Sequence, residues 1–86
     1  MPAVSQFFGV TIYLYFNDHA PPHFHAEYGE HEATYEIMTL VVLRDGLPRR
    51  AHAMVVEWAT FHRAELISNW ESARRQVPLS PIEPLD

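Results

Sequence analysis

The fold is decided by residues 23–37, whose sequence is His23-Phe24-His25-Ala26-Glu27-Tyr28-Gly29-Glu30-His31-Glu32-Ala33-Thr34-Tyr35-Glu36-Ile37. Apolar and polar side chains alternate along both halves of this stretch, as in strands that bury one face. Gly29-Glu30 separates the halves, and glycine suits the positive φ of a two-residue hairpin turn. We therefore predict an antiparallel hairpin with strands at about 24–28 and 32–37.

A two-residue turn also fixes the register of this hairpin. Three predicted pairs then share its polar face: Glu27 with Glu32, His25 with Thr34, and His23 with Glu36. Two facing carboxylates repel each other unless a cation lies near them. The register therefore predicts that imidazole and carboxylate groups gather on one face, outside the apolar core.

The segments before and after the hairpin add to the same sheet. Residues 11–16 are rich in aromatic and β-branched side chains, and residues 40–44 are mostly aliphatic, so both are predicted as strands. Residues 1–9 are expected to form a lead-in anchored by Phe7 and Phe8. The expected fold is α+β, with a small curved antiparallel sheet of three to four strands packed against a long C-terminal helix.

Helical periodicity runs over about residues 48–75, with a bend or break expected near residues 60–63. Its apolar stripe comprises Ala51, Met54, Val55, Trp58, Phe61, Leu66 and Ala73. This stripe is predicted to cover the apolar face of the hairpin. The proline-rich residues 77–86 are predicted to form an extended tail on the surface.

Composition limits the functional classes. The 86 residues suit a single domain over 1–86, with a net charge of −5 and no cysteine, which excludes disulfides and thiolate metal sites. No signal peptide and no membrane-spanning run is recognised, so we expect a soluble, cytoplasmic protein. No lysine or arginine precedes Arg44. This acidic, histidine-bearing half suits a cation better than a nucleic-acid backbone.

The strongest functional signal is a block of three histidines, His19, His23 and His25, around a rigid Pro-Pro pair. Imidazoles at i and i+2 on one strand face can bind one divalent ion, with a further ligand from the preceding turn. Asp18 and Glu27 are the predicted carboxylate ligands, and such a set suits Zn, Ni or Cu, with Fe also compatible. The alternative is that these histidines are polar residues of an open sheet face.

Five residues are secondary candidates for the site: Tyr13, Tyr15, Glu36, His62 and Arg63. Tyr13 and Tyr15 are expected on the histidine face, either as hydrogen-bonding groups or simply as strand-forming aromatics. His62 falls within the apolar helical stripe, with Glu65 three residues later. That pair is expected to be an internal hydrogen-bonded group, or else an addition to the site.

Three functions remain open on these residues, and the sequence does not decide whether the protein is an enzyme. The leading hypothesis is a metal- or ligand-binding module. A toxin–antitoxin-type component, either a small ribonuclease with histidine acid–base chemistry or its protein partner, is the alternative. A third hypothesis is an interaction module, with the Trp58/His62/Trp70 side of the helix as a surface for a homo-oligomer or a partner.

Two blocks of the chain resemble a small prokaryotic family, domain of unknown function 4160. They comprise the Phe7-to-Glu30 region and the Leu47-to-Trp70 region. The signature positions of the resemblance are Asn17, Asp18, His19, Pro21, Pro22, His23 and His25, with His62, Arg63 and Trp70 as secondary ones. The resemblance implies a component of a two-gene cassette, with a protein partner from domain-of-unknown-function family 2442. Met38-Thr39-Leu40 departs from the more polar turn expected in relatives.

Overall fold

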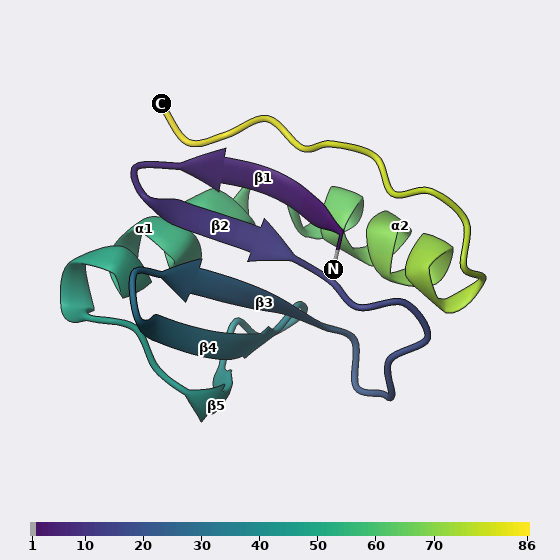
Figure 1. The fold of residues 1–86 in the computed structure, drawn as a ribbon, viewed down its shortest axis with the longest axis horizontal. Helices are drawn as coiled ribbons and strands as arrows, with labels where there is room; N and C mark the ends of the chain where they lie inside the picture. Colours follow the sequence, from purple (N-terminus) through teal and green to yellow (C-terminus); the bar gives the residue numbers. More distant parts are fainter. Residues whose placement is uncertain (1) are drawn as a thin grey trace.

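The computed structural model describes residues 2–86, which form a five-stranded antiparallel sheet followed by two helices (Figure 1). The strands are β1 (Ala3–Phe7), β2 (Val10–Tyr13), β3 (His23–Tyr28), β4 (His31–Glu36) and β5 (Val42–Asp45), and the helices are α1 (Arg49–Thr60) and α2 (Arg63–Arg74). Each strand pairs with the next in the order β1-β2-β3-β4-β5. The α+β class and the antiparallel sheet are confirmed, although the sheet has more strands than expected.

The central hairpin of β3 and β4 has the register that its alternation predicts. Glu27 lies opposite Glu32, and the predicted pairs of His25 and His23 form as well. Gly29 turns the chain with a φ of 60°. The apolar side chains Phe24 and Ala26 are fully buried, so the hairpin places its core face as expected.

Strand β1 replaces the expected lead-in. Val4 and Phe7 are both buried, although residues three apart point to opposite faces in a regular strand. An irregularity between Ala3 and Ser5 shifts the register against β2 and lets both side chains face the core. Because of this shift, the buried residues of β1 do not alternate with exposed ones in the sequence. Phe8 does not anchor the segment, because it lies in the turn to β2 and is 60% exposed.

Strand β2 ends at Tyr13, earlier than the predicted residues 11–16. The chain then leaves the sheet, and the Asn17 N–H donates to the carbonyl of Ala73 at the end of α2 (2.9 Å). Phe16, the last residue of the predicted strand, is exposed as a result. This excursion carries the segment between β2 and β3 toward the helices.

Strand β5 also differs from its predicted bounds of 40–44. Leu40 adopts a positive φ of 62°, and its N–H donates to the carbonyl of Glu36 (2.8 Å). The chain is therefore still turning where the strand was expected to begin. β5 starts at Val42 and continues to Asp45.

The C-terminal helix is broken within the predicted range of 60–63. A continuous helix over residues 48–75 would be about 42 Å long, whereas the longest dimension of the molecule is 33 Å. The break at Phe61-His62 lets both halves stay against the sheet. Phe61 was expected in the buried stripe but is 77% exposed, because it lies at the end of α1.

The core lies between the sheet and the helices. Phe24 of β3 stacks on Tyr35 (5.3 Å between ring centroids) and meets Trp58 of α1 edge-on (6.2 Å). The C-terminal tail runs back beside β1 (Figure 1), where the Ile82 N–H donates to the carbonyl of Val4 (2.8 Å). Across the described residues, no helix is long and apolar enough to cross a membrane.

Candidate metal centre

Three side chains converge where the segment between β2 and β3 approaches the sheet. Asp18 Oδ2 lies 2.8 Å from His23 Nε2 and 3.5 Å from His25 Nε2. One ligand atom from each of the three residues lies within 4.8 Å of the other two. Asp18, His23 and His25 could therefore hold a metal ion, and we call them the Asp18 group.

A hydrogen bond to the backbone orients the carboxylate. Its Oδ1 accepts the N–H of His19 (2.9 Å), as is common for an aspartate in a turn. Its other oxygen is left free to face the two imidazoles. The segment after β2 thus presents one carboxylate oxygen to the first residues of β3.

The far nitrogens of both histidines have partners of their own. The Nδ1 of His23 donates to the carbonyl oxygen of Pro21 (2.6 Å), and the Nδ1 of His25 lies 3.3 Å from the Thr34 hydroxyl. Metal-ligating histidines characteristically bind an outer acceptor in this way, which fixes the ring and its tautomer. Both Nε2 atoms are therefore turned toward Asp18.

The contacts of His23 require a positive charge. A carbonyl oxygen only accepts, so the Nδ1 of His23 must carry a proton. Its Nε2 then faces the Asp18 carboxylate, which is also an acceptor. Only a second ring proton, or a cation placed between these atoms, makes the 2.8 Å contact favourable.

The pKa values of Asp18 and His25 both lie below their usual values, for different reasons. For Asp18, burial raises the pKa, but the His19 N–H and His23 outweigh it and hold the pKa below its usual value. For His25, burial lowers the pKa, against the opposing effect of Asp18. Asp18 is therefore the anionic form, and the neutral form of His25 is favoured, as metal ligation requires.

The histidines are less exposed than an open sheet face would leave them. His23 is 6% exposed, and its ring packs against Trp70 of α2 (5.0 Å between centroids). His25 is flanked by Tyr13 (5.2 Å, stacked) and Tyr15 (4.8 Å, edge-on). The alternative of polar residues on an open sheet face therefore does not describe His23, because α2 covers the end of β3.

The Asp18 group opens into a pocket of about 310 Å³. Besides the group itself, its lining includes Tyr15, His19, Pro21, Thr34, Leu43 and Arg44. The pocket joins three parts of the chain: the segment after β2, the β3–β4 hairpin and the edge strand β5. Solvent therefore has access to one side of the group.

The remaining predicted ligands lie outside the group. His19 is exposed, with its Nδ1 3.2 Å from Asp18 Oδ1. Glu27 lies two pairs beyond His25 along β3, opposite Glu32. Glu36 accepts a hydrogen bond from the Thr39 hydroxyl (2.5 Å). Whether His19 or Glu27 adds to the coordination of an ion stays a prediction.

The predicted tyrosines lie beside His25, as expected. Tyr13 donates its hydroxyl proton to Glu32 (3.2 Å). Burial, with the nearby Tyr15 and Glu32, raises the pKa of Tyr13 far above its usual value. Tyr13 is thus a neutral hydrogen-bond donor at neutral pH, and its ring stacks on that of His25.

His62 and Arg63 lie at the start of α2, away from the Asp18 group. The Nδ1 of His62 contacts Glu65 Oε1 (2.5 Å), and its ring packs on Trp58 (5.3 Å). Neither His62 nor Arg63 lines the pocket of the Asp18 group. His62 and Glu65 are hydrogen-bonded as expected, but the pair lies at the surface rather than inside the core, and it does not add to the site.

Sequence reasoning missed several parts of the site. Thr34 was paired with His25 by the predicted register but was not recognised as its hydrogen-bond partner. The carbonyl of Pro21 carries no sequence signal, because any residue could supply it. Arg44 and Leu43 reach the pocket through β5, whose register was not predicted.

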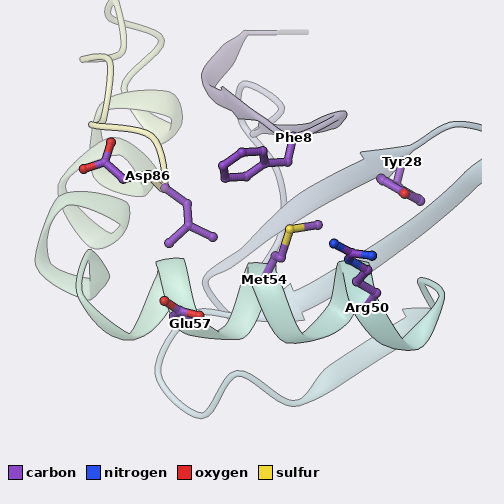
Figure 2. Close-up of a pocket in the computed structure, with 7 residues that line it drawn as sticks. Phe8, Tyr28, Arg50, Met54, Glu57 and Asp86 are labelled. Carbon is purple, nitrogen blue, oxygen red and sulfur yellow. The ribbon is translucent and has the colours of Figure 1, made fainter.

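A second pocket, of about 420 Å³, lies on the helical side of the sheet. Figure 2 shows Arg50, Met54 and Glu57 of α1 below Phe8 and the C-terminal Asp86. No histidine lines it among the described residues. The larger cavity is thus separate from the Asp18 group and lacks its ligand chemistry.

The family model that matches the chain is described as domain of unknown function (DUF4160) and covers residues 9–71. The match spans the Asp18 group and all elements except β1 and the last residues of α2. Neither the curated proteins nor the solved structures contain a significant match to the chain. The chain therefore belongs to the DUF4160 family, as the sequence resemblance predicted.

Proposed function

We propose that this DUF4160 protein binds a divalent transition-metal ion through Asp18 Oδ2 and the Nε2 atoms of His23 and His25. One observation carries the proposal: both imidazoles turn Nε2 toward a single carboxylate oxygen while their Nδ1 atoms are held from behind. The description of the family names no activity, so the support comes from this geometry.

The spacing of the ligand atoms suits a small ion. Zinc lies about 2.0–2.2 Å from imidazole nitrogen and carboxylate oxygen, so ligand atoms of a tetrahedral ion are about 3.3 Å apart. The contacts of Asp18 Oδ2, at 2.8 Å to His23 and 3.5 Å to His25, bracket that separation. An ion could enter with shifts of well under an ångström in these two contacts, while the three ligand atoms, which lie within 4.8 Å of one another, would draw together around it.

The donor set favours borderline transition metals. Two imidazoles and one carboxylate suit Zn, Ni, Cu or Fe, whereas Mg and Ca prefer shells made of oxygen. Three protein ligands leave at least one position for water or another molecule, as in catalytic zinc sites. His19, whose Nδ1 lies 3.2 Å from Asp18 Oδ1, could add a fourth nitrogen.

Calorimetric titration with Zn, Ni and Cu tests the proposal. We expect His25→Ala, or the double variant His23→Ala/His25→Ala, to weaken binding at least about 100-fold, because direct ligands matter more than outer-shell partners. His31→Ala is the matched control, since His31 is an exposed histidine of β4. Equal metal affinity in the wild-type protein and the double variant would refute the site.

Thermal unfolding gives an independent reading of the same site. An ion at 100 times its dissociation constant adds about 2.7 kcal/mol of stability. For a domain of this size, that raises Tm by roughly 10–20 °C. His19→Ala, compared in the same way, shows whether this exposed histidine joins the shell.

The alternative proposal is a toxin–antitoxin-type component that acts as a small ribonuclease. It is favoured by one observation, namely that His23, His25, Tyr15 and Arg44 line a single pocket. Two histidines with a cation can run acid–base cleavage of RNA. Cleavage that persists in EDTA and is lost in His25→Ala would favour this alternative.

A partner from family 2442 and self-association stay predictions.

A further inference from the structure

We infer that the pocket over the Asp18 group takes a small organic oxyanion, such as a carboxylate or a phosphate ester, whose oxygens bind both the metal ion and Arg44. This inference rests on the proposed metal site and adds the class of its ligand. Four features of the pocket lead to it: the position of Arg44, its lack of a partner, the charge balance, and the open coordination position.

Arg44 lies in the same cross-strand row as His25. Tyr13 pairs with His25, His25 with Thr34, and Thr34 with Arg44. Residues directly opposite each other in neighbouring strands project on the same face of the sheet. Neighbouring strands are about 4.8 Å apart, so the α-carbons of Arg44 and His25 are separated by about 10 Å. Two long side chains span that distance with room for a small group between them.

Arg44 is free to bind such a group. Within residues 2–86, each carboxylate at ion-pair distance pairs with a histidine, and Arg44 has no carboxylate partner. Its side chain is exposed and lines the pocket. A guanidinium presents a planar fork of N–H donors that matches the oxygens of carboxylate and phosphate groups.

The charges around the pocket favour an anion once a metal is bound. A divalent ion and Arg44 bring three positive charges, and Asp18 supplies one negative charge. Among the groups that line the pocket, neutral His23 and His25 leave two positive charges uncompensated, and Glu32, which accepts a hydrogen bond from Tyr13, lies outside this lining. An oxyanion would balance this excess at a site that solvent reaches from one side only.

The pocket also sets the size of the ligand. Its volume of about 310 Å³ is at the lower end for ligand sites, which hold about 300–1,000 Å³. Tyr15 and Leu43 add half-exposed apolar surface at its rim. A small organic acid or phosphate ester would place its head group between the ion and Arg44 and its apolar part on this rim.

Anion titration of the cobalt-loaded protein tests the inference. Co(II) has visible absorption that changes when an anion enters its coordination shell. Inorganic phosphate and acetate, titrated separately at constant ionic strength, serve as the two probes and distinguish the two kinds of head group. We expect at least one of them to perturb the cobalt spectrum, and to bind about tenfold or more weakly to Arg44→Gln, because a charge-assisted fork is lost.

Two matched variants test whether anion binding depends on the position of Arg44 and on the geometry of its guanidinium, rather than on positive charge alone. Arg50→Gln removes the same charge from the other pocket (Figure 2) and should leave anion binding unchanged. Arg44→Lys keeps the charge without the fork and should bind the anion with intermediate affinity. Cobalt affinity should not fall in Arg44→Gln, since Arg44 is no ligand of the ion.

The outcomes distinguish the two proposals. Anion affinity that is equal in the wild-type protein and Arg44→Gln refutes the oxyanion site while leaving the metal site intact. Equal anion binding with and without cobalt, measured by calorimetry, also refutes it, because the ion would then take no part. Failure of the wild-type protein to bind cobalt, zinc, nickel or copper refutes the metal site, and the oxyanion site with it.

Discussion

Replacing Asp18 by asparagine separates the metal site from the fold. The substitution keeps the shape of the side chain and removes its charge. In the metal-free protein, the asparagine Oδ1 can still accept the N–H of His19, as Asp18 Oδ1 does. The carboxamide nitrogen can donate to a neutral His23 Nε2, whose Nδ1 proton still binds Pro21. Every polar group therefore keeps a partner.

The cost to folding should accordingly be small. A hydrogen bond to a charged group contributes about 1.5–3 kcal/mol, and a neutral one about 0.5–1.5 kcal/mol. Exchanging one kind for the other at His23 should lower the free energy of unfolding by about 1 kcal/mol, or roughly 4–8 °C in Tm. Asp18→Ala should cost more, because it leaves the buried His23 Nε2 without any partner.

Metal binding should respond far more strongly. The charged oxygen that faces both imidazoles is lost, and a carboxamide is a poor ligand for zinc. We expect zinc affinity to fall at least about 100-fold in Asp18→Asn. Asp45→Asn is the matched control: it makes the same change of charge at an exposed position, whose positive φ of 57° asparagine tolerates.

The pH dependence of stability provides a second signature of Asp18. Its folded-state pKa is lowered, so its contribution is present above the unfolded pKa and is lost as pH falls through the folded value. Urea unfolding from pH 7 down to pH 3 should therefore show a smaller loss of stability in Asp18→Asn than in the wild type. Zinc affinity in Asp18→Asn within threefold of the wild type would refute the reasoning.

Three further predictions concern the scaffold. Ile82→Ala should lower the free energy of unfolding by about 2–4 kcal/mol in urea titrations, because the tail packs this side chain against β1 at 4% exposure; a loss under 0.5 kcal/mol would show that the tail is not part of the core. Gly29→Ala should cost about 1 kcal/mol through its φ of 60° alone, since an added Cβ meets nothing within 4 Å, and Gly29→Asn should cost less. Burial raises the pKa of Tyr35 to about 12, so its contribution to stability is complete below pH 10 and is lost as pH rises through 12. Tyr35→Phe should therefore lose less stability than the wild type between pH 10 and 12, and identical alkaline unfolding curves would contradict this.

The sequence predicts the part of the fold that strict alternation and a two-residue turn control. In the β3–β4 hairpin, every second side chain is apolar, so a slip of one residue would move the apolar side chains to the polar face, and the two-residue turn selects among the registers that remain. Strand β1 escapes this reasoning because its irregularity places Val4 and Phe7 on one face at a spacing of three. The position of the helix break near residues 60–63 was predictable, but its consequence for the site was not.

The candidate site also has a part that the sequence predicts and a part that it does not. Asp18, His23 and His25 are close in sequence, so a turn and one strand suffice to bring them together. Trp70 and Arg44 reach them by tertiary paths instead: Trp70 through the turn between α1 and α2, and Arg44 through the shifted pairing of β5. Local spacing reveals candidate ligands, whereas the groups that cover the ligands and select what else binds depend on how distant elements pack.

The placement of Asp18 would link the proposed metal binding to the stability of the whole fold. Its segment leaves the sheet after Tyr13 and is tied to the end of α2 by the hydrogen bond from Asn17 to Ala73. An ion held by Asp18 and the two β3 histidines would cross-link this segment to the sheet at a second point. The unfolded chain does not hold these ligands together, so the free energy of binding adds to the free energy of folding. A domain of this size buries little surface and has no disulfide, so the ion would supply a constraint that the core alone does not.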